Sequence, residues 1–217
     1  MSAPAIELRG VTIVEKGATL LRAVSLSVPD ATGYVFLGRG EATRELLRCL
    51  RGDRSPDAGS IVLLGMDPRK ARRRLKARLG SDLLLLENPT ADEIGRLPSN
   101  QTFFAVTDRP EIPDSFGGTV GLLGRGRLVA EGSVRSLRDR FRRVRYSNRL
   151  TETRTDLGTE LDEFEAVRVR VRGWGIEAVV SNFDDAAFER FARIDGVDDA
   201  AADPMTLPEI FEAVAGG

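Results

Sequence analysis

The chain of 217 residues contains no histidine and a single cysteine, Cys49. Without histidine it cannot form a Ser-His-Asp or Cys-His catalytic site, a histidine metal site or a histidine pH switch. One cysteine excludes an internal disulfide framework and a cysteine-rich zinc site, and it suits a reducing compartment. We therefore expect no metal site of these kinds, and we expect Cys49 to be a small buried hydrophobe on the first helix.

Long apolar runs are also absent. No segment approaches the roughly 18–20 apolar residues that a membrane-spanning helix needs, and the first nine residues lack the basic and then apolar order of a signal peptide. We therefore expect a cytoplasmic protein. Aromatic residues make up only 6% of the chain, but 41% of it is hydrophobic and 30% is charged. This composition predicts one large folded domain, or a domain with a small satellite.

The net charge of −1 hides an uneven distribution. Residues 1–150 hold 26 of the 32 basic and 17 of the 33 acidic residues, whereas residues 151–217 carry a net charge of −10. Lysine is scarce, since 29 of the basic residues are arginine, a bias that genome composition alone can produce. The run 69–78 contains seven basic residues but no interleaved aromatic. It is interpreted as a solvated helix face rather than a site for nucleic acid or anionic lipid.

Short apolar segments alternate with helical ones, which predicts an α/β fold with a parallel sheet in the first two thirds. Two alternating segments, 5–13 and 20–28, predict antiparallel strands joined by a turn at Lys16-Gly17. Leu83–Leu86 is wholly apolar, and a parallel strand covered on both faces is expected there. Further strands are predicted at 34–37, 60–64, 102–106, 118–123 and 127–131, and helices at 44–51 and 68–79.

The last third of the chain predicts a smaller unit. The arginine-rich segment 136–149 predicts a helix, and the polar segment 150–165 predicts a linker. Strands are expected at 166–172 and 175–180, and Trp174 between them is interpreted as core or edge packing. Helices are expected at 184–194 and from Thr206, where Thr206 and Glu209 would form a capping box. The predicted domains are a core at 1–136, a basic helix and linker at 137–165, and a small α/β domain at 166–217.

Several segments occur in the order found in bacterial ABC transporter nucleotide-binding subunits, and the chain resembles that family. They are AIELRGVTI, LLRAVSLSV, GRGEATRELLRCLRG, SPDAGSIVLLGMDPRK, LLLLENPTADE and VGLLGRGRLVAEGS. The ending PMTLPEIFEAVAGG resembles the close of the C-terminal extension in subunits that serve small exporters. The resemblance implies a P-loop NTPase-like, ABC ATPase-type sheet-and-helix core with antiparallel strands at its N-terminus and a small α/β C-terminal extension.

The family's phosphate loop, Gly-x-x-Gly-x-Gly-Lys-Ser/Thr, is damaged in this sequence. The loop starts at Gly38 and Gly40 but is one residue short. The lysine that reaches the terminal phosphates is replaced by Thr43, and Arg44 stands where a hydroxyl would hold magnesium. Glu41 adds a negative charge beside the phosphate position. These positions are candidate nucleotide-binding residues that are expected to have lost the function.

The family's remaining catalytic positions are altered as well. The family's motif is Leu-Leu-Leu-Leu-Asp-Glu-Pro-Thr. In this chain Glu87 replaces the aspartate that organises magnesium, and Asn88 replaces the glutamate that acts as general base. An amide cannot accept the proton of an attacking water. Asp108 stands at the switch histidine, and Val14, Glu15 and Lys16 replace the aromatic that stacks on adenine. The Gln loop, helical subdomain and signature sequence are missing, because the basic helix leads through Gly80 directly into 83–86.

The resemblance implies a degenerate ATP-binding-subunit-like protein that acts as a non-catalytic partner in a bacterial ABC exporter complex. Its partners would be an ABC permease or an intact ABC ATPase homologue, in a homodimer or heterodimer, with no nucleic acid. ATP and magnesium would be cofactors only if the degenerate loop still bound them. The alternatives are a weakly active ABC-type ATPase with an unconventional phosphate loop and a scaffold unrelated to transport. The protein would be cytoplasmic or peripheral on the inner face of the cell membrane.

Overall fold

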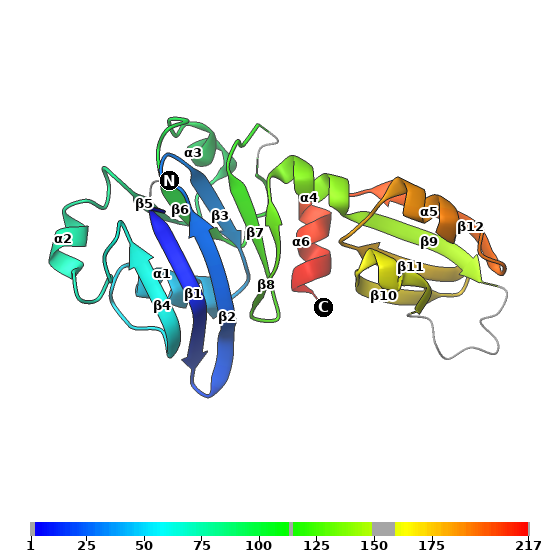
Figure 1. Cartoon of the computed structure of the whole chain (residues 1–217), viewed down its shortest axis with the longest axis horizontal. Coiled ribbons are helices and arrows are strands. Elements are labelled where there is room, and N and C mark those ends of the chain that lie inside the picture. The colour runs from blue at the N-terminus through cyan, green and yellow to red at the C-terminus, as the bar shows by residue number, and fades with distance from the viewer. Residues whose placement is uncertain (1–2, 113–114, 149–158, 217) are drawn as a thin grey trace. The chain divides into compact units, whose positions relative to one another are not determined.

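The computed structural model describes residues 3–112, 115–148 and 159–216. The chain forms two compact units, Met1–Val134 and Arg135–Gly217, and each is described by itself. Within the described ranges, no helix is both long and apolar enough to cross a bilayer. Figure 1 shows the strands and helices of both units.

Two sheets make up the first unit. In the three-stranded sheet, β1 (Ile6–Glu15) lies between β2 (Ala18–Val28) and β4 (Ala58–Leu63), and both pairings are antiparallel. The predicted hairpin at the start of the chain is therefore confirmed. Alternate residues of β1 and β2 are buried, as their apolar and polar alternation predicts.

The second sheet has five strands in the order β5-β6-β3-β7-β8. The first four are parallel and β8 returns antiparallel to β7, so the α/β fold class is confirmed. The central strands β3 and β6 are buried along their whole length. The strands are β3 (Gly33–Leu37), β5 (Leu84–Glu87), β6 (Phe103–Thr107), β7 (Thr119–Gly124) and β8 (Arg127–Gly132).

Helix α1 (Glu41–Leu50) packs against strands of both sheets and joins their apolar faces into one core. Its leucines Leu46, Leu47 and Leu50 are buried, as predicted from their helical spacing. Cys49 is also buried, and burial raises the pKa of its thiol to about 11. The thiol therefore stays protonated at neutral pH, and the interpretation of Cys49 as a small core residue is confirmed.

Two expectations for the first unit are wrong. Strand β5 is at the edge of its sheet and its leucines are only half-buried, so it is not covered on both faces. The basic helix is α2 (Arg72–Lys76), much shorter than the predicted 68–79, because only Leu75 of its residues is buried. A second short helix, α3 (Ala91–Gly95), follows β5 and is capped by Thr90 and Glu93.

The second unit contains a four-stranded antiparallel sheet in the order β10-β11-β9-β12. This strand order is that of a ferredoxin-like sheet. The buried aromatic rings of Tyr146 and Phe164 both contact Phe191 in the core on one face of the sheet. The elements are α4 (Val134–Arg140), β9 (Arg142–Asn148), the 3-10 helix η1 (Thr159–Phe164), β10 (Ala166–Arg172), β11 (Gly175–Val180), α5 (Asp185–Phe191), β12 (Val197–Pro204) and α6 (Leu207–Ala215).

The structure corrects the predicted boundaries of this part of the chain. The helix expected over 136–149 ends at Arg140, and β9 is an inner strand whose Val144 and Tyr146 are buried. The division therefore falls after Val134, and 137–165 is not a separate helix and linker; residues 149–158 of that segment lie outside the described residues. The capping box of Thr206 and Glu209 at the start of α6 is confirmed.

Candidate functional site

The carboxyl ends of β3, β5 and β6 meet the N-terminus of α1 around a small cavity of about 190 Å³. Parallel α/β sheets bind ligands at this end of their strands. Every candidate residue of the phosphate loop lines the cavity except Gly38, which directly follows β3, and so do Glu87, Asn88 and Asp108. The lining residues are Gly40, Glu41, Thr43, Arg44, Glu87, Asn88, Val106 and Asp108.

The loop between β3 and α1 is shorter than the sequence predicted. Helix α1 begins at Glu41 instead of Arg44, so only Gly38, Arg39 and Gly40 connect the strand to the helix. Gly40 has a φ of 72°, a left-handed conformation that glycine adopts without strain and that permits this tight turn. This connection is tighter than the family's phosphate-loop pattern implies.

Gly38 is used for packing. Its amide donates to the carbonyl of Thr107 at 3.0 Å, which extends the hydrogen bonding between β3 and β6. A Cβ atom at this position would lie 2.9 Å from side-chain atoms of both Leu123 and Thr43. The glycine is therefore required by its neighbours, and its N–H is unavailable to a phosphate.

Negative charge predominates around the cavity. Glu41, Glu87 and Asp108 contribute carboxylates, whereas Arg44 is the one basic residue among the residues that line it. Glu87 forms an exposed ion pair with Arg51 at 3.5 Å. The hydroxyl of Thr43, at the lysine position, donates to the Gly40 carbonyl at 3.3 Å. An anionic ligand would meet net repulsion here, and no cluster suited to a metal ion occurs in the described part of the chain.

The backbone of Asn88 gives this residue a structural role. Its φ is 48°, and its amide donates to the Val106 carbonyl at 2.8 Å, just beyond the end of β5. Asparagine tolerates the left-handed conformation better than most other residues. Asn88 therefore fits the turn that follows β5, at the position where the family has its general base.

Replacing Asn88 with glutamate is expected to destabilise the protein by about 1 kcal/mol, because glutamate is less suited to a positive φ. The new carboxylate should not restore ATP hydrolysis, since the lysine and the phosphate loop are still lacking. Urea denaturation and phosphate release should be measured on the same preparations. Asn88→Gly serves as the control and should be at least as stable as wild type, whereas ATP turnover by Asn88→Glu would contradict the interpretation.

A second cluster lies in the segment where the family carries its adenine-stacking aromatic. The guanidinium of Arg54 contacts the carboxylates of Glu15 at 2.8 Å, Glu45 at 2.7 Å and Asp57 at 3.1 Å. It also donates to the Val14 carbonyl at 3.2 Å, so it ties the end of β1 to α1. Sequence reasoning missed this cluster, because nothing in the pattern shows that Glu15, Glu45 and Asp57 converge on one arginine.

Glu45 is buried, and its charge is maintained by this cluster. Burial alone would raise the pKa of the Glu45 carboxyl, but hydrogen bonds from Arg54 and Arg48 outweigh it and hold the pKa below its usual value. Opposite charge and hydrogen bonding stabilise the ionised form. The segment that would accommodate a base in an ATP-binding protein is here a network of internal ion pairs.

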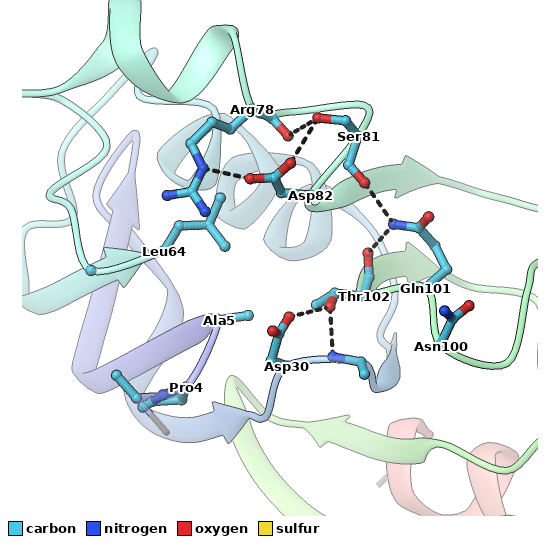
Figure 2. Close-up of a pocket in the computed structure, with 13 residues that line it drawn as sticks. Pro4, Ala5, Asp30, Leu64, Arg78, Ser81, Asp82, Asn100, Gln101 and Thr102 are labelled. Carbon is cyan, nitrogen blue, oxygen red and sulfur yellow. Dashed lines mark hydrogen bonds and ion pairs between the residues drawn. The ribbon is translucent and has the colours of Figure 1, made fainter. Parts of the chain in front are cut away.

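The missing helical insert leaves a compact joint between α2 and β5. Figure 2 shows that Arg78 donates to Asp82, while Ser81 contacts both Asp82 and the Arg78 carbonyl. Gln101 donates to the Ser81 carbonyl at 3.3 Å and links the joint to the start of β6. A cavity of about 570 Å³ adjoins these residues, and the side chains of Asp30 and Thr102 line its other side.

Apolar surface at the joint is only partly covered. Leu83 is fully buried and Leu79 packs against the core, so local packing recovers much of what the insert would have covered. Leu84, Leu85 and Leu86 of β5 are only partly buried.

Comparisons with known proteins agree with this architecture. No protein-family model matches the chain. The arabinose import ATP-binding protein AraG of Azospirillum brasilense is 33% identical over 105 residues, which are 44% of this chain and 20% of that relative. The chain thus spans about a fifth of the length of the curated protein it matches.

Solved structures give the likeness in three dimensions. A bacterial Atm1-family ABC exporter with ATP bound matches with a TM-score of 0.51 and 14% identity, over 64% of this chain and 40% of the exporter chain. The ATP-binding subunit of an ABC transporter matches with a TM-score of 0.49 and 12% identity, over 62% of this chain and 92% of the subunit. The chain resembles ABC transporter ATP-binding subunits and has the mixed α/β fold of their ATP-binding cassette.

Proposed function

We propose that this chain is a non-catalytic partner subunit of an ABC transporter, with a cassette fold that has lost its nucleotide site. The observation that carries the proposal is the three-residue connection from β3 to α1, in which the Gly38 amide is bonded to Thr107 and Thr43 replaces the lysine. The cassette's sheets and first helix are retained, whereas the groups that would hold and hydrolyse a nucleotide are replaced.

Several features support the absence of ATP and magnesium as cofactors. The cavity of about 190 Å³ is smaller than the roughly 300–1,000 Å³ of ordinary small-molecule pockets. Its carboxylates repel phosphate, and the adenine side is occupied by the Arg54 cluster. Neither end of the site offers what a nucleotide needs.

The proposed partners are an ABC permease, an intact ABC ATPase homologue, or both. The relatives named above are an import ATP-binding protein and an exporter, both components of transporters. The partly buried leucines of β5, beside the joint where the insert is missing, offer some apolar surface for such a contact. The protein would work as a homodimer or heterodimer, peripheral on the inner face of the membrane.

Purification from the native host and sedimentation test this proposal together. Tagged chain should co-purify with a multi-span permease or an intact ABC ATPase. At tens of micromolar it should sediment as a homodimer, or as a heterodimer with that ATPase. A dimer held by apolar contacts should persist at high salt, whereas one held by charged contacts should weaken. A monomer at both salt concentrations, with neither protein co-purifying, would refute the proposed role.

One observation favours a second candidate, a slow ATPase with an unconventional loop. Arg44 is exposed at the cavity and forms no ion pair with any residue that the structure describes, so it is available to an anion. If this candidate were correct, Arg44→Glu would abolish residual phosphate release, and Arg73→Glu on α2 would leave it unchanged. On the proposal made here, both variants release phosphate no faster than a protein-free control.

A further inference from the structure

Strand β10 is an unpaired edge of the sheet in the second unit. It pairs with β11 alone, and in the described ranges no other strand pairs with its outer side (Figure 1), while the end of α6 contacts the strand near Arg168. Large hydrophobic residues are exposed here: Val171 is 65% exposed, Trp174 53% and Val169 41%. An exposed edge strand with apolar side chains is a template for another strand.

The two faces of β10 differ in chemistry. Val169 lies opposite Ala178 and Val171 opposite Ile176, so both valines are on the face that carries the aromatic core. That core ends at β11 and leaves them uncovered. The other face carries a row of arginines, which are Arg168, Arg170 and Arg172.

Positive charge on the arginine face is only partly compensated. Arg172 pairs with Glu177 at 3.1 Å, and Arg168 donates to the Gly216 carbonyl at 3.4 Å. Arg170 lies opposite Glu177 across the strands but forms no hydrogen bond or ion pair with it, nor with any other described residue. It is exposed and available to a partner's carboxylate.

A second copy of β10 is an unsuitable partner. Residues directly opposite each other in an antiparallel pair share a face of the sheet, so antiparallel self-pairing would place arginine opposite arginine on one face. Like charges in directly opposite positions are destabilising. A complementary strand would instead carry acidic residues on the arginine face and apolar residues on the valine face.

We propose that the free edge of β10 binds an extended segment of a partner protein in which acidic and apolar residues alternate. The segment adds a fifth strand to the sheet, its backbone bonding to β10 while its carboxylates meet Arg170 and its neighbours. The apolar residues cover Val169 and Val171. Strand β10 belongs to the second unit and the residues at the nucleotide position belong to the first, so the inference does not depend on the function proposed above.

A synthetic peptide of sequence Gly-Ser-Glu-Val-Glu-Val-Glu-Ser-Gly tests the inference on the full chain. Trp174, the only tryptophan in the chain, lies in the turn that joins β10 to β11 and reports binding by its fluorescence. The peptide should change this fluorescence saturably and slow amide hydrogen exchange in β10. The matching peptide with lysine in place of glutamate should bind about tenfold more weakly or not at all.

Reversing the charge at residue 170 of β10 should reverse the preference for the glutamate peptide over the lysine peptide. Arg170→Glu should weaken the glutamate peptide about tenfold and strengthen the lysine peptide, and Arg73→Glu in the first unit is the matched control that should change neither. Circular dichroism should show both variants folded. Failure of the glutamate peptide to bind up to millimolar concentration would overturn the inference. An equal affinity of this peptide for wild type and Arg170→Glu would also overturn it. Binding of phosphatidylserine vesicles in place of the peptide would identify a lipid surface and would also overturn it.

Discussion

Replacing Arg54 with alanine is expected to lower the free energy of unfolding of the first unit by about 3 kcal/mol. The side chain is 18% exposed and contacts three carboxylates, of which Glu45 is buried. Removing the guanidinium leaves that carboxylate without its shortest ion pair and in a poorly solvated position. Breaking a buried pair by deleting one partner is among the more destabilising single changes.

This loss should depend on pH. Because the pKa of Glu45 is lowered in the folded protein, the ion pair contributes its full stability above the carboxyl's ordinary pKa and loses it as the pH falls through the lowered value. Wild type and Arg54→Ala should therefore differ most near neutral pH and converge in acid. Arg9→Ala, which removes a 70% exposed partner of Glu7, is the matched control and should cost less than about 0.5 kcal/mol. An equal loss for both variants in urea denaturation would contradict this role of Arg54.

Replacing Gly59 with alanine should be at least as damaging, with a loss of more than about 3 kcal/mol. Gly59 lies in β4 with a φ of 81°, across from an irregular part of β1. A Cβ atom there would lie 2.4 Å from the carbonyl oxygens of both Arg9 and Gly10. These are backbone atoms, so the strands themselves must separate, and the sheet that covers α1 would be disturbed.

Gly65 supplies a control for the backbone conformation alone. It follows the same strand with a φ of 77°, but no atom lies within 4 Å of the position that its Cβ would take. Gly65→Ala should therefore lower the free energy of unfolding by only about 1–2 kcal/mol, the cost of placing alanine in the left-handed conformation. The difference between the two variants measures the steric contact. If Gly59→Ala and Gly65→Ala unfolded at the same urea concentration, the close approach of β1 and β4 would be refuted.

Elements were predicted correctly from the sequence where the spacing of their apolar residues matches the face that is buried. Alternation in β1 and β2 and the leucines of α1 predict their elements, because one face of each is buried. Strand β9 was missed because its arginines obscure the alternate Val144 and Tyr146 that enter the core. Strand β12 is rich in alanine and aspartate, which have low strand propensity, so only its pairing with β9 makes it a strand. Trp174, predicted as core or edge packing, is 53% exposed in the turn between β10 and β11, so it is not a core residue.

Prediction of the candidate site shows a similar limit. The family resemblance named residues after β3, β5 and β6, and the structure brings them together because the ends of parallel strands share one edge of a sheet. The start of α1 at Glu41 could not be predicted, since it depends on the tight turn at Gly40 and on the contacts of Gly38 with Leu123 and Thr43. The Arg54 cluster depends on residues that only the tertiary structure brings together.

Titration of the purified chain with Mg-ATP, by calorimetry and thermal unfolding, tests the central claim most directly. A nucleotide present at 100 times its dissociation constant would stabilise the fold by about 2.7 kcal/mol. The proposed function predicts no saturable heat and no rise in melting temperature at millimolar Mg-ATP, because on that proposal the short loop between β3 and α1 has lost its phosphate site. Stoichiometric binding with a micromolar dissociation constant, abolished by Arg44→Glu and retained in Arg73→Glu, would contradict the account.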